Sequence, residues 1–273
     1  MQKTVSHRID LRKAFTLVEL LVVISIIAML LSILMPSLNK VREKAKQLVC
    51  STQTRQYSIA VYAYASDKNG QIPFFADSFQ GGGPSTASFS EDPSAWFNVV
   101  GPYLGGKQVI KKEDSQAFAK VRRCPSGKRN KTAPGGWTGW IGVNYGGFDS
   151  TLAPFIYGSS KSGNTVTARY SPCKLSNVKH ASTWMMLLDV QDWFVYSPTY
   201  VTWCFMRDTD HDGLPDTAWS GSTAVPIYNG ANPKIHNNGT VVGLVDGHVE
   251  WVRFKELWKL DKGQVSHPFW YNK

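Results

Sequence analysis

Residues Phe15 to Met35 read FTLVELLVVISIIAMLLSILM, a run of 21 residues whose one charged side chain is Glu19. A helix of this length spans about 31 Å, which matches the roughly 30 Å hydrocarbon core of a membrane. The preceding residues 1–13, MQKTVSHRIDLRK, are net positive, so the positive-inside rule predicts a cytoplasmic N-terminus. We therefore expect a single-pass membrane protein with the rest of the chain on the far side of the membrane from the cytoplasm.

Two simpler explanations of this segment are less satisfactory. A secretory signal peptide has a shorter apolar stretch and a cleavage site of small residues, which the following MPSLNK (residues 35–40) does not offer. A plain membrane anchor fits the length but leaves Glu19 unexplained, because a carboxylate in a spanning helix is costly and needs a partner or a function.

The stretch Arg12 to Leu20, RKAFTLVEL, resembles the class III signal of type IV prepilins and type II secretion pseudopilins. The resemblance implies that a prepilin peptidase/methyltransferase cuts between Ala14 and Phe15 and methylates the new amino terminus, giving N-methylphenylalanine. Glu19 then takes the fifth mature position, where the family has its glutamate. Pro36 takes the twenty-second, where the family often has a helix-kinking proline. Ala14 departs from the glycine that usually precedes the cut.

The position of Glu19 also has a physical meaning. One turn into a helix, a carboxylate faces the positive end of the helix macrodipole. In a filament it can meet the free amine of a neighbouring subunit's Phe15, and this attraction would offset its desolvation and fix the register between subunits. The resemblance implies that the partners of this chain are the processing peptidase, other pilin-like subunits and the inner membrane, and that its globular domain lies in the periplasm or at the cell surface.

Beyond Pro36 the sequence is typical of an amphipathic helix that ends near Asp67-Lys68-Asn69-Gly70, a helix stop and turn. We expect a leader over residues 1–14, a spanning helix over 15–35, its amphipathic continuation over 36–66 lying on the globular domain, and an extracytoplasmic β-rich domain over 67–273. The apolar positions of the continuation are Leu38, Val41, Ala45, Leu48, Val49, Ile59, Ala60 and Ala63.

In the globular region, short apolar runs bounded by turn signals predict strands at 184–188, 199–206, 240–245 and 248–254. The stretches 78–94 and 127–147 are rich in turn residues and are expected to be loops. Asp246-Gly247 predicts a two-residue hairpin turn. Pairing about it would place Val242, Leu244, Val249 and Trp251 on the core face and His248 and Glu250 on the wet face. The expected fold is α+β and pilin-like, with the long N-terminal helix packed on an antiparallel β-sheet domain with long loops.

Nine residues separate His236 from Asp246-Gly247. This spacing resembles the C-terminal H-x9-DG signature of a large family of prepilin-like proteins carried by planctomycete-type bacteria. The resemblance implies location and architecture, and no substrate. Similar landmarks lie along most of the chain, at Cys50, Asp67 to Pro73, Arg123 to Ser126, Val143 to Gly147 and Val178 to His180.

His236, Asp246 and His248 could bind a metal in principle. Turn chemistry accounts for the Asp-Gly pair, however, so we expect Asp246 to serve the turn and His236 to hydrogen-bond a nearby loop. The spacing of the four cysteines includes no C-x-x-C pair, which argues against structural zinc. Outside the cytoplasm they permit disulfides, with three complete pairings of Cys50, Cys124, Cys173 and Cys204 left open.

Residues 208–216, DTDHDGLPD, have the spacing of a calcium-binding loop. The stretch resembles the loops of dockerin and thrombospondin type 3 repeats. Trp219 stands where an EF-hand has its bidentate glutamate, so we expect weak Ca²⁺ binding, with an acidic turn that holds no ion as the alternative. The cation would relieve repulsion between alternating carboxylates. The expected ligands are Asp208, Asp210, Asp212, Asp216 and the carbonyl of Leu214.

The net charge of +10 is scattered, and its one cluster, over residues 120–131, has no nucleic-acid motif beside it, so we expect a solvated face and no nucleic-acid partner. No G-x-S-x-G elbow, P-loop or H-E-x-x-H motif is present, so we expect no catalytic residues and no enzyme.

The expected function is that of a structural subunit of a type II secretion pseudopilus or a type IV pilus-like filament. The alternative is a membrane-tethered ligand- or glycan-binding protein, or a hydrolase, that uses the leader only as an anchor. The aromatic side chains that could form a binding platform are Trp137, Trp140, Trp184, Trp193, Trp203 and Trp219.

Overall fold

The computed structural model describes residues 16–77, 79–80, 92–106, 120–129, 139–146, 149–162, 165–190, 194–196, 235–261 and 264–272. Two compact units are distinguished, Met1–Arg42 and Glu43–Lys273. The expected cleavage site at Ala14 and Phe15, the expected strand at 199–206 and the expected calcium loop at 208–216 lie outside the described residues.

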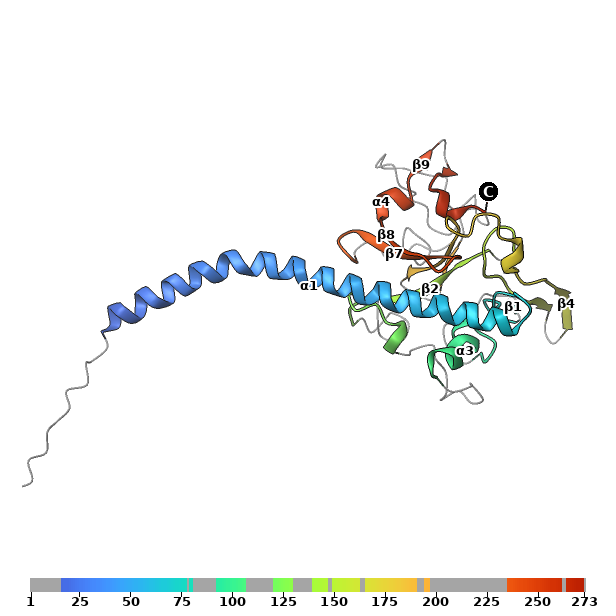
Figure 1. Ribbon diagram of the computed structural model, residues 1–273, viewed down its shortest axis with the longest axis horizontal. Helices are drawn as coiled ribbons and strands as arrows, with labels where there is room; N and C mark the ends of the chain where they lie inside the picture. Colours follow the sequence, from blue (N-terminus) through green and yellow to red (C-terminus); the bar gives the residue numbers. More distant parts are fainter. Residues whose placement is uncertain are drawn as a thin grey trace, which may run out of the picture. The chain divides into compact units, whose positions relative to one another are not determined.

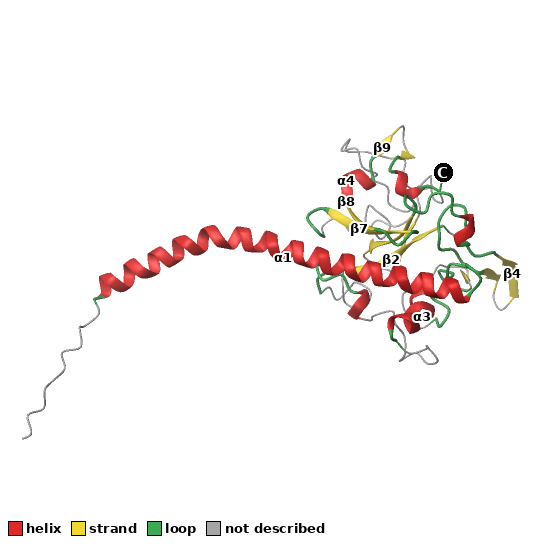
Figure 2. Ribbon diagram, viewed as in Figure 1, coloured by secondary structure: helices red, strands yellow, loops and turns green. Residues whose placement is uncertain are grey.

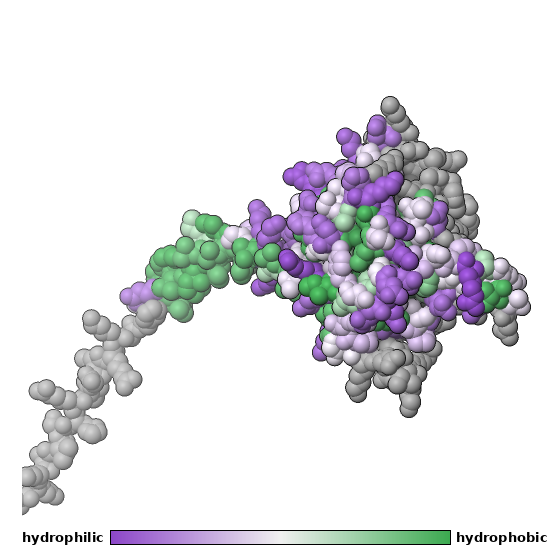
Figure 3. Space-filling view, turned by 45° about the vertical axis from the view of Figure 1, so that its right-hand side comes forward, coloured by the Kyte–Doolittle hydropathy of each residue, from purple (hydrophilic) through white to green (hydrophobic). Residues whose placement is uncertain are grey.

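One long helix, α1, runs over Leu17–Asp67 and continues through Pro36 (Figure 1). In the first unit its large apolar side chains are exposed, and they form a nearly continuous hydrophobic surface (Figure 3). By length and composition, it is the one helix in the described part of the chain that could cross a membrane, and its most apolar 18-residue stretch has a mean hydropathy of 2.9. This exposed apolar surface is what a lipid-facing segment requires.

The second unit is built on a five-stranded sheet in the order β6-β2-β5-β7-β8 (Figure 2). All neighbours pair antiparallel except β6, which runs parallel to β2 at one edge. The predicted fold, a long helix on an antiparallel sheet, is confirmed. The bounds are β2 Trp140–Tyr145, β5 Met185–Val190, β6 Phe194–Tyr196, β7 Gly239–Leu244 and β8 Val249–Arg253.

The part of α1 that packs on this sheet buries Ala60 but not the larger side chains of the predicted apolar stripe. Leu48, Val49 and Ile59 are 64%, 49% and 60% exposed. Opposite Gly243 the helix lies close to β7, because a Cβ on Gly243 would be 2.9 Å from Cγ2 of Thr54. The buried helix residues are Gln47, Cys50, Thr54, Tyr57, Ser58, Ala60, Val61 and Ala65.

The hairpin of β7 and β8 lies where it was predicted, but its register differs by one residue. Val241 pairs with Trp251 and Gly243 with Val249, so the core-face assignment of Val242 and Leu244 together with Val249 and Trp251 was wrong. The turn contains three residues, 245–247, since the N–H of Leu244 donates to the carbonyl of His248 (2.8 Å). The third, Gly247, has φ +85°, the left-handed conformation that closes a three-residue hairpin. His248 and Glu250 are exposed, as expected.

The sheet is covered on both faces. One hydrophobic cluster joins Tyr57 and Val61 of α1 to Trp184 and Leu187. A second, on the opposite face, packs Val242 and Leu244 against helix α4, Phe254–Leu257, and the 3-10 turn η7, Pro268–Trp270. Because both faces are buried, all six residues of β7 are buried.

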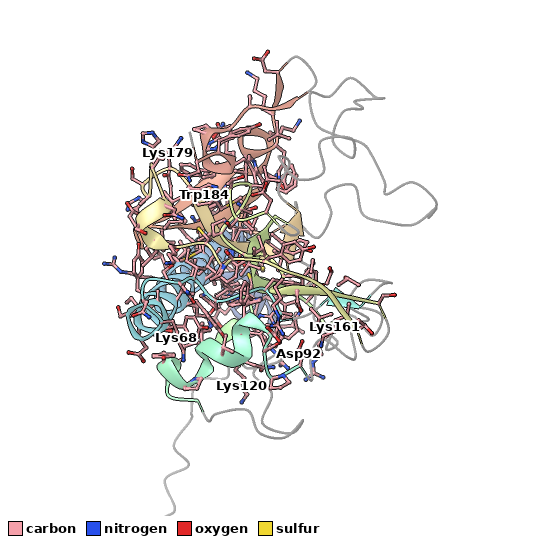
Figure 4. All side chains as sticks on the ribbon, turned by 90° about the vertical axis from the view of Figure 1, so that its right-hand side faces the viewer. Lys68, Asp92, Lys120, Lys161, Lys179 and Trp184 are labelled. Carbon is pink, nitrogen blue, oxygen red and sulfur yellow. The ribbon has the colours of Figure 1, made fainter. Side chains whose placement is uncertain are left out.

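The described tryptophans that were candidates for a binding platform belong to the core. Trp140 and Trp184 are both fully buried. Figure 4 shows Trp184 among packed side chains, with Lys68 and Lys179 at the outside. Strand β2, which contains Trp140, lies within the stretch 127–147 that was expected to be a loop. The glycines and polar residues of this stretch obscured a strand that is buried on both faces.

The remaining elements are short. Arg122 in the 3-10 turn η3 is fully buried, with its guanidinium 4.6 Å from the ring centre of Phe97, so the expectation of a solvated basic cluster was wrong at this position. The other bounds are α3 Trp96–Val100, η1 Gly101–Leu104, η3 Lys120–Arg122, a small sheet of β1 Phe79–Gln80, β3 Ser159–Ser162 and β4 Thr165–Arg169, η5 Leu175–Asn177, and the pair β9 Leu260–Asp261 and β10 Gln264–Val265.

Candidate functional site

The first described residues form a capping box at the start of α1. The backbone N–H and the hydroxyl of Thr16 donate to Oε2 of Glu19, at 2.9 and 2.8 Å. The N–H of Glu19 donates in return to the hydroxyl of Thr16, at 3.3 Å. This reciprocal pattern satisfies backbone donors that a helix N-terminus leaves without partners. Glu19 therefore has a partner within its own chain, a role that the macrodipole argument did not include.

The residues of the H-x9-DG pattern have separate surroundings. Asp246 is exposed, and its Oδ1 accepts the N–H of His248 at 2.8 Å, so its expected turn role is confirmed. His236 is 1% exposed and contacts the segment 124–126, as expected of a histidine that bonds a nearby loop. The possible metal trio of His236, Asp246 and His248 is not assembled in the described structure, because the last two side chains point to solvent.

His236 instead belongs to a buried cluster with Cys50, Cys124 and Asp189. One potential ligand atom from each side chain lies within 4.8 Å of all the others. Cys50 comes from α1, Cys124 from the segment after η3, Asp189 from β5, and His236 from the turn before β7. All four are at most 1% exposed. The fold thus gathers two sulfurs, one nitrogen and one carboxylate from four separate segments.

The contacts inside this cluster, which we call the Cys50–Cys124–Asp189–His236 cluster, are short. The thiol of Cys50 donates to Oδ1 of Asp189 at 2.8 Å, and Sγ of Cys124 lies 3.1 Å from Nε2 of His236. Nε2 of His236 also lies 3.4 Å from Oδ2 of Asp189. The N–H of Val241 donates to the same Oδ2 at 2.8 Å and orients the carboxylate.

The backbone of His236 is held in an unusual conformation. His236, Asn237 and Asn238 have φ values of 47°, 59° and 61°, three consecutive residues in the left-handed region. Such residues normally occur singly because the conformation is strained, and strain of this kind is characteristic of functional sites. The indole of Trp251 stabilises the turn by donating to the carbonyl of His236 at 3.0 Å. The turn directs the imidazole into the core.

The other ring nitrogen of His236 is held by a hydrogen-bonded chain. Oγ of Ser126 lies 3.2 Å from Nδ1 of His236 and donates to Oε2 of Glu43 at 3.1 Å. Because a hydroxyl has one hydrogen and a carboxylate can only accept it, Ser126 must accept from an Nδ1–H of His236. In the neutral ring Nε2 then carries the lone pair, and this atom faces Cys124 and Asp189.

The four groups strongly perturb one another's acidity. The neighbouring thiol of Cys50, reinforced by His236, lowers the pKa of Cys124 to about 5. Burial, together with the charge of Cys124, raises the pKa of Asp189 to about 7. The proximity of Cys124 and burial raise the pKa of Cys50. Burial alone would lower the pKa of His236, but Cys124 and the charge of Asp189 raise it. The protonation states of these four buried side chains therefore depend on one another.

Sequence patterns did not predict this cluster, because metal-ligand motifs are recognised by ligands that lie close together along the chain. Cys50 and Asp189 are 139 residues apart, and Cys124 and His236 are 112 apart. Cys50, Cys124 and His236 were each part of a quoted landmark, whereas Asp189 follows a predicted strand and carried no signal of its own. The described cysteines Cys50, Cys124 and Cys173 form no disulfide with one another in the structure.

Comparison with known proteins gives one result, at the other end of α1. Residues 10–35 match the prokaryotic N-terminal methylation motif. No curated protein and no solved structure matches the chain. The motif implies a pilin-like protein that prepilin peptidase processes, and the apolar helix that follows it indicates a single-pass anchor in the inner membrane.

Proposed function

We propose that this protein is a structural subunit of a pilin-like filament, of the type II secretion pseudopilus or type IV pilus class, and that it has no catalytic activity. The observation that carries the proposal is the methylation motif at residues 10–35, continuous with a 51-residue helix that also packs on the globular domain. A membrane anchor alone does not require this continuity, whereas a helix that moves from the membrane into a filament does.

The exposed side of α1 supports assembly. Leu48, Val49 and Ile59 are large, apolar and about half exposed or more, although they belong to the extramembrane unit. At about 100° per residue they fall within an arc of about 100° on the helix surface, opposite most of the buried residues. Exposed apolar surface of this kind marks an interaction site, and the occupant we propose is the corresponding helix of a neighbouring subunit.

The capping box suggests how Glu19 takes part. In the single chain its carboxylate accepts two bonds from Thr16. After cleavage, the methylated amine of Phe15 in a neighbouring subunit would supply a positive charge to the same carboxylate. A carboxylate can accept several hydrogen bonds, so Glu19 can hold its cap and this amine together.

The assembly surface is tested by placing a charge on it. Val49→Lys, in full-length protein expressed in its native membranes, is expected to abolish crosslinked multimers, because lysine would be buried against an apolar neighbour. The matched control is Val166→Lys, at a 38% exposed valine on β4, which should leave crosslinking unchanged. Both variants should keep the wild-type tryptophan fluorescence, since each valine is solvent-accessible.

Equal crosslinking of the wild type and Val49→Lys would contradict the proposal. So would protein from native membranes that is processed yet migrates only as a monomer. That second result would favour a tethered ligand-binding protein that uses the leader for anchoring alone.

A further inference from the structure

We propose that the Cys50–Cys124–Asp189–His236 cluster is a structural metal site that holds one Zn²⁺ ion. Two thiolate sulfurs, an imidazole nitrogen and a carboxylate oxygen form a donor set that Zn²⁺ accepts, with tetrahedral geometry. Four such ligands around one zinc lie about 3.3–3.8 Å from one another, given bond lengths of 2.0–2.3 Å. The contacts of 2.8, 3.1 and 3.4 Å within the cluster are close to these values.

The surroundings of the ligands are those of a metal site. A metal-bound histidine normally donates its second ring N–H to an oxygen, and here that oxygen is the hydroxyl of Ser126, which is anchored by Glu43. The Asp189 carboxylate receives the N–H of Val241. These bonds leave Nε2 of His236 and an oxygen of Asp189 directed at the two sulfurs.

Burial indicates a structural role. Each of the four ligands is at most 1% exposed, so the protein supplies every ligand and no position is open to substrate or water. An ion here would join α1, the segment after η3, strand β5 and the turn before β7.

A disulfide between Cys50 and Cys124 is the competing chemistry outside the cytoplasm. It would remove the thiol hydrogen that Cys50 donates to Oδ1 of Asp189. Among the described residues, Oδ1 of Asp189 accepts a hydrogen bond from Cys50 alone. Zinc, in contrast, employs the carboxylate and both sulfurs together, and it also accounts for the strained turn that directs His236 inward.

The first test measures metal and thiols in the same protein. Full-length chain is purified in detergent from native membranes, and its zinc content is measured together with its intact mass, native and denatured. We expect about one zinc per chain and, after its removal, free thiols at Cys50 and Cys124. A Cys50–Cys124 disulfide overturns the proposal, and so does reduced protein that fails to bind added Zn²⁺.

The second test identifies the ligands by replacing zinc with Co²⁺, which absorbs visibly when thiolates bind it. The sulfur-to-cobalt absorption should appear in the wild type and in Cys173→Ser, a control at a buried cysteine outside the cluster. It should weaken in Cys124→Ser, which leaves one thiolate, and be lost when Cys50 and Cys124 are both replaced by serine. If the double variant retains the band, or if the wild type lacks it, the site is not the one described.

The third test does not remove a ligand, so it survives any failure of Cys124→Ser to fold. Ser126→Ala should keep binding one ion at saturation but with about 10- to 100-fold weaker affinity, because the imidazole loses its orienting acceptor. Tryptophan fluorescence should remain that of the wild type. Unchanged zinc affinity in Ser126→Ala would overturn the inferred coordination through Nε2 of His236.

Discussion

Gly243→Ala tests the close contact between α1 and β7. The new Cβ would lie 2.9 Å from Cγ2 of Thr54, 3.2 Å from Oγ of Ser58 and 3.3 Å from Cβ of Leu187. Carbon atoms pack best at about 3.5–4.0 Å, so the helix and the strand would have to separate by roughly 0.6 Å or more. Overpacking of this size costs about 1–3 kcal/mol, while the lower chain entropy of alanine in the unfolded state returns about 0.4–1 kcal/mol. We expect a net loss of about 1–2 kcal/mol in the free energy of unfolding.

The assay is urea unfolding of the full-length protein in detergent, followed by tryptophan fluorescence. All ten tryptophans lie after residue 95, so the signal reports the globular domain and not the apolar half of α1. With a slope of about 2 kcal/mol per molar urea, the midpoint should fall by about 0.5–1 M.

A double-mutant cycle provides the control. Thr54→Ser removes Cγ2, the nearest atom to the new Cβ, so Gly243→Ala should cost less in that background, with a coupling of at least about 0.5 kcal/mol. Strictly additive effects of the two substitutions, or a midpoint in Gly243→Ala equal to the wild type, would refute the packing argument.

Three further predictions concern the N-terminus and the acidic loop. Intact mass of the protein from native membranes should show loss of residues 1–14 and one added methyl group on Phe15; an N-terminus at Met1 would contradict processing. Glu19→Gln should retain the helix cap but reduce crosslinked multimers far more than Thr16→Ala, because an amide can accept from the Thr16 N–H but carries no charge; equal losses would mean that the cap, and not the charge, matters. We propose that the loop at 208–216 binds Ca²⁺ weakly, so calcium should raise the melting temperature of the wild type but not of an Asp210→Ala, Asp212→Ala variant. Equal melting temperatures of the wild type in calcium and in chelator would reject this site.

Several features of the fold could be predicted because their signals are local. The apolar run from Phe15 and the helix stop at Asn69-Gly70 are continuous in sequence, and the structure ends α1 at Asp67. The Asp246-Gly247 pair located the hairpin correctly. Its register could not be read from that pair, because the loop length depends on Gly247 being the third residue of the turn rather than the second.

Other features could not be predicted because they depend on tertiary contacts. Part of the buried side of α1 depends on the shape of β7, because Gly243 admits the polar side chains of Thr54 and Ser58, which a hydrophobic pattern does not predict to be buried. The Cys50–Cys124–Asp189–His236 cluster is assembled from distant segments, so a rule based on C-x-x-C spacing could not find it.

The sharing of α1 between two environments restricts where a protease could release the domain. Its apolar half ends near Met35, and its first buried residue is Gln47. A cut between these positions would leave every buried residue of the helix on the domain. A cut after Cys50 would remove that side chain from the core, and a cut near Asp67 would remove every α1 side chain from the cluster that covers one sheet face, including Tyr57 and Val61. A shed form that remains folded should therefore begin within the roughly ten residues that separate the membrane from the sheet.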